Sequence, residues 1–357
     1  TPPAAVIVEP AVRDTSPAIA LIAHYAAAKL PPNALILVLP SDHLIPDAKA
    51  FQTMVESAAP LAEAGNLITF GITPTFPATG YGYIQQGEPL GAGFKVKRFV
   101  EKPNEATATG YLASGDYTWN AGIFLFSPSA MLAALATHHP ELAAAAQKAG
   151  TSLVHDGLFT RPDKTAYTAC PKISIDYAVM EPAAAAGGLA MVPFTGSWND
   201  IGNWHAMWEE TKQDSNGNAI IGQAQLTDCE GCYVHGNAKT LIAAHGLKNQ
   251  VIIHTPDATL ILPREKSGDV KDTHTRPAPA GHPPPTTHTT DYRPWGGYTV
   301  LADETDYKAK HLWVKPNGRL SLQSHKHRAE HWVVISGIAT VTRNDETLTV
   351  NKSESVF

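Results

Sequence analysis

Two aspartates in this sequence each follow an apolar run, the place where a carboxylate stands at the mouth of an α/β sheet. Asp42 lies in LPSDH directly after ALILVL, and Asp200 lies in GSWNDIGNW after LAMVPF. Carboxylates at the carboxyl ends of parallel strands hold metal ions and phosphates, and two of them form a hard-oxygen site that suits Mg²⁺. The alternative is that each aspartate only caps the next turn, because spacing along the chain does not show that the two meet.

Three further motifs carry residue types that bind sugars and phosphates. TGYGYI places Gly82 in a loop before a predicted strand, where glycine lets the backbone approach a ligand. In FVEKP, Glu101 can accept hydrogen bonds from sugar hydroxyls, and the adjacent Lys102 can neutralise a phosphate. In WNAGIFLF, Asn120 is either a turn residue or a reader of hydroxyl groups. Taken singly, these motifs are equally consistent with a plain turn or an exposed ion pair.

A fourth group of candidate residues lies near the end of the chain, in LQSHKHRAEHWVVISG. His325, His327, His331 and Glu330 are metal-ligating types, and their crowding indicates a metal cup on a small β-barrel. On a strand, His325 and His327 face one side, whereas the neighbours Glu330 and His331 face opposite sides. The alternative is a polar strand edge without a metal.

Strands and helices alternate over about the first 210 residues, and this pattern must position the residues named so far. Alternation of this kind predicts an open, mixed or mostly parallel α/β sheet with ligands at the carboxyl ends of its strands. Residues 34–39 read as a buried parallel strand. The other predicted elements are strands at 67–71, 95–100 and 123–126 and helices at 51–64 and 130–149, the last interrupted at Pro140.

The pattern changes from about residue 217, where short β-rich runs recur between Gly, Asn and Asp residues. These runs predict a β-solenoid-like segment over 217–272. The Pro/Thr/His-rich stretch 273–290 cannot bury a core and is predicted to be a linker, and 291–357 is predicted to be part of a cupin β-barrel.

Composition excludes several classes of protein. The chain has 357 residues, 43% of them hydrophobic and 17% charged, which predicts a globular protein of two or three domains. A formal net charge of −6 argues against a nucleic-acid partner. No apolar run approaches the roughly 18 residues of a membrane span, and no signal peptide is visible at the N-terminus. We therefore expect a cytoplasmic protein with no membrane partner.

Three cysteines, Cys170, Cys229 and Cys232, are too few for a disulfide framework and suit a reducing cytosol. Cys229 and Cys232 form a C-x-x-C motif followed by His235, which is compatible with zinc or redox chemistry. The sequence supplies no fourth ligand and no thioredoxin-like helix start. We therefore expect buried strand or solenoid cysteines.

Taken in order, the motifs are far more specific than any one of them. EPAVRDTSPA, LPSDH, TGYGYI, FVEKP, WNAGIFLF, SIDYAVME and WNDIGNW together resemble the sugar-1-phosphate nucleotidyltransferases, specifically the bacterial mannose-1-phosphate guanylyltransferases. YRPWGGY and LQSHKHRAEHW resemble the cupin half of the bifunctional members, which also carry a phosphomannose isomerase. The resemblance covers nearly the whole chain.

The resemblance implies a role for individual residues. Asp42 and Asp200 would hold the catalytic Mg²⁺, and Lys102 would contact the phosphate of the sugar phosphate. The family usually has Asn where this chain has Asp14, so the contribution of that position is open. The remaining contacts would be to the mannose, from Gly82, Glu101 and Asn120, and to the same site from Arg13, Thr15 and, in SIDYAVME, Asp176.

The implied reaction joins GTP and mannose 1-phosphate into GDP-mannose and pyrophosphate. The family's glycine-rich GGxGxRLWPxSR segment is absent, so we expect a chain truncated at both ends that lacks the nucleotide loop. In the cupin, His325, His327 and Glu330 would bind a divalent metal such as Zn²⁺ or Co²⁺, with Gln323 nearby, in a site that we expect to be incomplete. Isomerase activity of this chain is therefore not expected.

Two alternative functions and one structural question stay open at this point. One is another sugar-1-phosphate nucleotidyltransferase, and the other is a sugar-phosphate-binding protein without catalysis. The sequence also leaves a homo-oligomer open.

Overall fold

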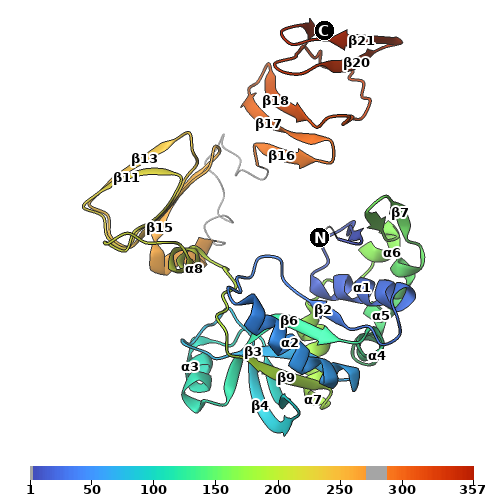
Figure 1. Cartoon of the computed structure of the whole chain (residues 1–357), viewed down its shortest axis with the longest axis vertical. Helices are drawn as coiled ribbons and strands as arrows, with labels where there is room; N and C mark the ends of the chain where they lie inside the picture. The colour runs from blue at the N-terminus through green and yellow to red at the C-terminus, as the bar shows by residue number, and fades with distance from the viewer. Residues whose placement is uncertain (1–2, 271–287) are drawn as a thin grey trace. The chain divides into compact units, whose positions relative to one another are not determined.

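The computed structural model describes residues 3–270 and 288–357 (Figure 1). The chain divides into two compact units, residues 1–207 and 208–357, which we call unit 1 and unit 2. The predicted linker 273–290 lies almost entirely outside the described residues. No helix in the described ranges is long and apolar enough to cross a membrane.

The centre of unit 1 is a six-stranded sheet with the order β2-β6-β3-β9-β5-β4. Each predicted strand is present, with slightly different ends. The strands are β2 (Ile36–Val38), β3 (Leu67–Ile72), β4 (Tyr83–Leu90), β5 (Gly93–Val100), β6 (Tyr117–Phe126) and β9 (Leu189–Phe194).

The α/β class and the mixed sheet are confirmed, but the expectation of mostly parallel strand pairs is wrong. Among the described strands of this sheet, only β3 and β9 pair in parallel, and β2 pairs antiparallel with β6. The reason is that β2 and β3 do run in the same direction, as strand–helix–strand alternation predicts, but β6 inserts between them in the opposite direction.

The sheet is also not fully open. An additional pairing of β4 with β6 closes β3, β6, β4, β5 and β9 into a ring. This closure depends on the length of β6, which pairs with β2 through Phe124–Phe126 and with β4 through Tyr117–Trp119. The alternation of strands and helices in the sequence does not predict that one long strand pairs with two different strands along the same edge.

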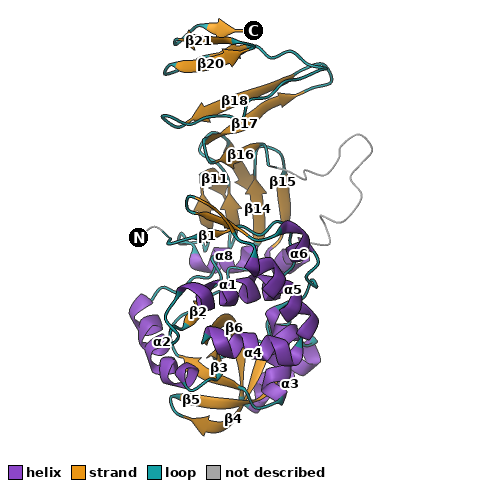
Figure 2. Ribbon diagram, turned by 90° about the vertical axis from the view of Figure 1, so that its right-hand side faces the viewer, coloured by secondary structure: helices purple, strands orange, loops and turns teal. Residues whose placement is uncertain are grey.

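Helices bury both faces of the sheet (Figure 2), which explains why its strands read as continuous apolar runs. Along β6, Phe124 and Phe126 belong to one core cluster, whereas Ile123 and Leu125 belong to the other. The first cluster includes residues of α1 and α4, and the second includes Met54 of α2. The helices are α1 (Thr15–Lys29), α2 (Ala48–Glu63), α3 (Glu105–Ser114), α4 (Pro128–His138), α5 (Pro140–Thr151), α6 (Lys164–Thr168), the π-helix η1 (Asp176–Met180) and α7 (Glu181–Ala185).

Both helix predictions are confirmed. α2 begins three residues before the predicted start because the Asp47 carboxylate caps it by accepting from the N–H of Ala50 at 2.9 Å. The predicted break at Pro140 separates α4 from α5, since proline opens the second helix at its first position. A small sheet of β1 (Val6–Ile7), β8 (Phe159–Arg161) and β7 (Val154–Asp156) completes unit 1.

The predicted solenoid-like segment is confirmed by its strand pairing in unit 2. β10, β12 and β14 pair in parallel, as do β11 and β13, while β15 adds to β14 antiparallel. Cys229 and Cys232 are buried in this segment and form no disulfide. The elements are α8 (Trp204–Glu210), which crosses the unit boundary, β10 (Ala219–Ile221), β11 (Gln223–Thr227), β12 (Tyr233–His235), β13 (Leu241–His245), β14 (Gln250–His254), β15 (Thr259–Pro263) and a 3₁₀ turn (Arg264–Asp269).

The last part of the chain consists of short antiparallel sheets. β16, β17 and β18 form one sheet, and β19 with β22 and β20 with β21 form two pairs. The bounds are β16 (Thr290–Arg293), β17 (Gly296–Asp303), β18 (Lys308–Val314), β19 (Trp332–Val333), β20 (Ala339–Arg343), β21 (Glu346–Val350) and β22 (Ser355–Val356).

Candidate functional site

The loops that carry Asp42 and Asp200 lie side by side. Leu44 and Asn199 form an isolated antiparallel bridge, with N–H···O distances of 2.8 and 3.1 Å in the two directions. The bridge joins the segment after β2 to the segment after β9. It therefore brings two acids that are far apart in the sequence to the same end of the sheet.

His43 lies close enough to Asp42 and Asp200 for both charges to affect its pKa. Burial lowers the pKa of its imidazole, and the charges of Asp42 and Asp200 both act against that decrease. The Nδ1 atom accepts a hydrogen bond from the indole N–H of Trp198 at 3.2 Å, with the rings edge-to-face at 5.2 Å. His43 was not selected from the sequence, although it directly follows Asp42.

The residue types and the placement of the two aspartates are compatible with a divalent cation. Oδ1 of Asp200 accepts hydrogen bonds from the Tyr81 hydroxyl at 2.8 Å and from the N–H of Gly202 at 3.2 Å. A Cβ atom at position 202 would lie 2.6 Å from Oδ2, so glycine keeps that oxygen accessible. The described residues contain no cluster of three or more metal-ligating side chains. Two carboxylates with the remaining positions left to water and phosphate are typical of Mg²⁺ sites.

The residues predicted to contact the sugar also come together. The carbonyl of Gly82 accepts from the N–H of Asn120 at 2.8 Å. A Cβ atom at Gly82 would lie 2.5 Å from Oε2 of Glu101 and 3.2 Å from Cβ of Asn120, so only glycine fits between these two side chains. The close approach places one loop glycine, one carboxylate and one amide around the same point.

Asn120 has little hydrogen-bonding capacity left for a ligand. Its Oδ1 accepts from the Thr69 hydroxyl at 2.8 Å and from the N–H of Gly122 at 3.2 Å. Its Nδ2 donates to Oδ1 of Asp176 at 3.0 Å. Because a side-chain amide has two N–H donors, one N–H remains for a hydroxyl group of a substrate.

Lys102 is the cation of this cluster. Its Nζ lies 3.2 Å from Oε1 of Glu101, and its side chain is 61% exposed whereas that of Glu101 is 10% exposed. Burial lowers the pKa of the Lys102 ammonium group. Its hydrogen bond to Glu101 and the nearby carboxylate charges have the larger combined effect, so the pKa is raised. The backbone of Lys102 has a φ of +46°, a left-handed conformation that is costly for a residue with a side chain and must be held by its surroundings.

The carboxyl groups of Glu101 and Asp176, near Lys102, are largely buried, which disfavours their ionised form. Burial raises the pKa of Glu101, the charges of Asp176 and Glu181 raise it further, and Lys102 opposes them. Burial likewise raises the pKa of Asp176, against the effect of its hydrogen bond from Asn120. Glu181, which the sequence reading did not select, accepts from the N–H of Glu101 at 3.1 Å.

Replacing Asp176 by asparagine is expected to raise the thermal stability of unit 1 by a few degrees above neutral pH. The pKa of Asp176 is raised in the folded state, so its stability contribution is present below the ordinary aspartate pKa of about 3.9 and is lost as pH rises through the folded-state value. Asparagine avoids that loss and still offers an oxygen to Asn120. Thermal unfolding at pH 5 and pH 8 measures the difference, which should be larger at pH 8.

The exposed Glu63, replaced by glutamine, is the matched control for this stability prediction. It should leave the melting temperature unchanged at both pH values. A less stable Asp176→Asn variant at pH 8 would show that the ionised carboxylate contributes more through its hydrogen bonds than it costs through burial.

Thr15 is hydrogen-bonded next to Asp176, whereas Arg13 is hydrogen-bonded to α6. Oγ1 of Thr15 accepts from the N–H of Ile175 at 2.9 Å, so the start of α1 is attached to the segment that carries Asp176. The guanidinium of Arg13 instead donates to the carbonyl oxygen of Thr168, at the end of α6, with Nε at 2.9 Å. No described hydrogen bond or ion pair joins Arg13 to the Gly82–Asp176 cluster.

Tyr81 connects the two groups of residues. Its hydroxyl binds Asp200, and its carbonyl oxygen accepts from the N–H of Lys102 at 3.2 Å. The sequence reading used TGYGYI only for its glycine. A tyrosine beside a functional glycine in a loop was the available signal, but its partner lies 119 residues away and cannot be identified from spacing.

Of the metal ligands predicted near the end of the chain, all of which lie in the described ranges, only His325 and Glu330 are in contact. Nε2 of His325 lies 3.1 Å from Oε1 of Glu330, and the guanidinium of Arg328 binds both, at 2.8 and 2.9 Å. Within the described parts of the chain, no hydrogen bond or ion pair joins His327 or Gln323 to this pair.

The prediction of strand alternation in this stretch is wrong. Residues 321–331 have no strand structure, and β19 begins only at Trp332. Because the stretch pairs with no described strand, the two-residue periodicity that would place His325 and His327 on one side does not apply. His331 contacts the ring of Phe357 edge-to-face at 6.1 Å.

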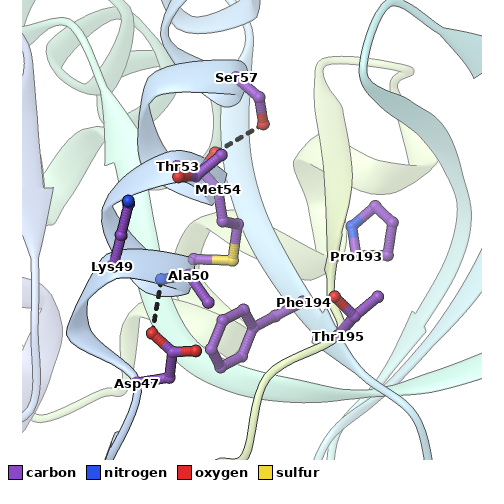
Figure 3. A pocket seen from close by; sticks show the side chains of 9 residues that line it. All are labelled: Asp47, Lys49, Ala50, Thr53, Met54, Ser57, Pro193, Phe194 and Thr195. Atoms are coloured by element: carbon purple, nitrogen blue, oxygen red, sulfur yellow. Dashed lines mark hydrogen bonds between the residues drawn. The ribbon is translucent and has the colours of Figure 1, made fainter.

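A shallow groove in unit 1 contains none of the predicted site residues (Figure 3). It has a volume of about 400 Å³ and lies between the first turns of α2 and the end of β9. Its lining includes the buried Met54 and Phe194, with Lys49, Thr53 and Thr195 exposed beside them. The groove therefore marks the surface between α2 and β9 and does not define the site.

Comparison with protein families covers almost the whole chain. The Nucleotidyl transferase family matches residues 3–217, the MannoseP isomerase/GMP-like beta-helix domain matches 222–274, and the Mannose-6-phosphate isomerase C-terminal family matches 281–357. The first of these matches includes all of the candidate residues in unit 1.

Individual proteins are similar over the same length. Xanthan biosynthesis protein XanB of Xanthomonas campestris is 46% identical over 99% of this chain and 74% of its own length, and a mannose-1-phosphate guanylyltransferase of Escherichia coli K12 is 42% identical with the same coverage. A crystal structure described as mannose-1-phosphate geranyltransferase from Thermus thermophilus is 33% identical, with a TM-score of 0.65 over 74% of this chain and 76% of that chain. This chain therefore belongs to the nucleotidyltransferase family of mannose-1-phosphate guanylyltransferases that carry a mannose-6-phosphate isomerase C-terminal domain.

Proposed function

We propose that this protein transfers the guanylyl group of GTP to mannose 1-phosphate, forming GDP-mannose and pyrophosphate. The observation that carries the proposal is the placement of Asp42 and Asp200 beside the cluster of Gly82, Glu101 and Lys102, with Tyr81 bonded to both groups. Relatives named for this activity, or for xanthan and alginate biosynthesis, support it. The product would then serve polysaccharide synthesis in the cytoplasm.

The nucleophile of this reaction needs no general base from the protein. A sugar phosphate has a second pKa of about 6, so its phosphate oxygen is largely dianionic at neutral pH. The work of the protein is to position this oxygen in line with the α-phosphorus of GTP and to compensate charge. Lys102 supplies the positive charge for the phosphate of mannose 1-phosphate.

The sugar is held by neutral and acidic groups. Oε2 of Glu101 and the remaining N–H of Asn120 would bind hydroxyl groups of the mannose, with the backbone of Gly82 against the ring. Thr15 and Asp176 support this arrangement from α1 and η1, and we also include Arg13 in the substrate-binding set. Asp42 and Asp200 would hold Mg²⁺, which when bound neutralises charge that develops on the phosphate oxygens.

The proposal assigns this chemistry to residues 1–216. The solenoid-like segment 217–272, the linker 273–290 and the cupin-type region 291–357 would follow as separate parts. Isomerase chemistry is not included, since only His325 and Glu330 meet among the candidate cupin ligands.

The test incubates the chain with GTP, mannose 1-phosphate and Mg²⁺ and measures GDP-mannose and pyrophosphate. Although the chain lacks the family's glycine-rich segment, the proposal requires equal amounts of the two products. Much less product is expected when UTP replaces GTP or when glucose 1-phosphate replaces mannose 1-phosphate. Calorimetric titration with mannose 1-phosphate alone is run in parallel. Binding without any product would contradict nucleotidyl transfer by this chain and favour a sugar-phosphate-binding function.

A further inference from the structure

Tyr81 determines how the carboxylate of Asp200 is oriented. The Tyr81 hydroxyl and the N–H of Gly202 both donate to Oδ1, at 2.8 and 3.2 Å. These two donors fix one oxygen and leave Oδ2 for a cation. Groups that orient a metal ligand in this way commonly change metal affinity by about 10- to 100-fold when they are removed.

The ring of Tyr81 has little freedom to turn away from Asp200. Its centroid lies 5.1 Å from that of Trp119 and 5.7 Å from that of Trp198, in both cases edge-to-face. Phe76 packs on Trp119 at 4.9 Å and completes an aromatic group around the tyrosine. Because Trp198 itself bonds to His43, this group also contacts the loop of Asp42.

The backbone of the same residue reaches the sugar-phosphate residues. The Tyr81 carbonyl accepts from the N–H of Lys102 at 3.2 Å, and the next carbonyl, of Gly82, accepts from the N–H of Asn120 at 2.8 Å. Lys102 has a positive φ, so this hydrogen bond helps to hold a backbone conformation that would otherwise relax.

We propose that Tyr81 is a positioning residue that couples the cation-binding aspartates to the phosphate-binding lysine. Its hydroxyl orients Asp200, and its carbonyl fixes Lys102 at a set distance from the two aspartates. The inference rests on the proposed function, because it takes Asp42 and Asp200 as the cation ligands.

The test uses Mn²⁺ as a spectroscopic substitute for Mg²⁺ and measures its dissociation constant for the free protein by electron paramagnetic resonance. Tyr81→Phe keeps the ring and removes the hydroxyl, and it should weaken Mn²⁺ binding about 10-fold. The affinity for mannose 1-phosphate without metal should change less than about twofold, since Lys102 keeps its backbone bond. Tyr25→Phe, on α1, is the matched control and should change neither value.

A double variant separates this inference from the proposed function. If Tyr81 acts through Asp200, then Tyr81→Phe/Asp200→Ala binds Mn²⁺ no more weakly than Asp200→Ala alone, because alanine leaves Tyr81 no side-chain oxygen to orient. Additive losses would overturn the inference, as would unchanged Mn²⁺ affinity in Tyr81→Phe while Asp200→Ala is weakened. Unchanged affinity in Asp200→Ala itself would instead overturn the cation site. Thermal unfolding of each variant shows whether any loss comes from misfolding.

Discussion

Asparagine in place of Asp200 is expected to lower the rate of GDP-mannose formation by at least about 10²-fold, the scale at which removal of one charge-stabilising group acts. The change is nearly isosteric, and the amide oxygen of asparagine can still accept from Tyr81 and Gly202. The loop should therefore keep its structure and lose only its negative charge. Initial rates at saturating GTP and mannose 1-phosphate, measured over a range of Mg²⁺ concentrations, give the result.

Asp42→Asn should produce a loss of the same order, because we propose that both carboxylates hold one cation, and the Leu44–Asn199 bridge brings their loops together. The exposed Asp257→Asn in unit 2 is the control and should retain the full rate. Near-normal rates of GDP-mannose formation in both site variants would contradict the assignment of Asp42 and Asp200 as cation ligands. A loss in only one of them would mean that the cation depends on a single aspartate.

The sheet and its functional end could be anticipated because the relevant strands are buried on both faces. Leu189–Phe194 reads as an unbroken apolar run and Leu67–Ile72 as one interrupted only by Thr69, and polar residues stand directly after both runs. The family motifs then selected which polar residues to expect. The structure brings Gly82, Glu101, Lys102, Asn120 and Asp176 together as that selection requires.

What could not be anticipated depends on contacts between segments that are distant in the sequence. β6 inserts antiparallel between β2 and β3, and its own sequence does not indicate which strands it pairs with. The hydrogen bond from Tyr81 to Asp200 likewise joins two segments that are distant in the sequence. In both cases the partner is set by the three-dimensional path of the chain and not by local spacing.

The stretch around His325 shows the opposite error. Its histidine spacing has a clear meaning only if the backbone is extended, and the structure has an irregular segment there. Arg328 then becomes the cation that bonds to both His325 and Glu330. The residue types suit a metal site, but the extended backbone that their spacing requires is not present.

Lys102→Ala is expected to raise the KM for mannose 1-phosphate by roughly 30-fold, which corresponds to about 2 kcal/mol for truncation of one partner of a close charge pair. The kcat should fall much less, because in the proposed role the ammonium group would bind the phosphate in both the ground state and the transition state. Steady-state kinetics with mannose 1-phosphate varied at saturating GTP separate the two parameters. Lys97→Ala, on the exposed face of β5, is the matched control and should leave KM unchanged.

The expected loss is large because Lys102 is the positive charge among three carboxylates. Burial and the charges of Asp176 and Glu181 raise the pKa of Glu101, and burial raises the pKa of Asp176. Without the ammonium group, the sugar phosphate would enter a cluster of negative charges. Glu101 would also lose its ion pair with Lys102, in which Nζ lies 3.2 Å from Oε1. An unchanged KM in Lys102→Ala would show that the phosphate binds elsewhere, and that Lys102 serves only to neutralise Glu101.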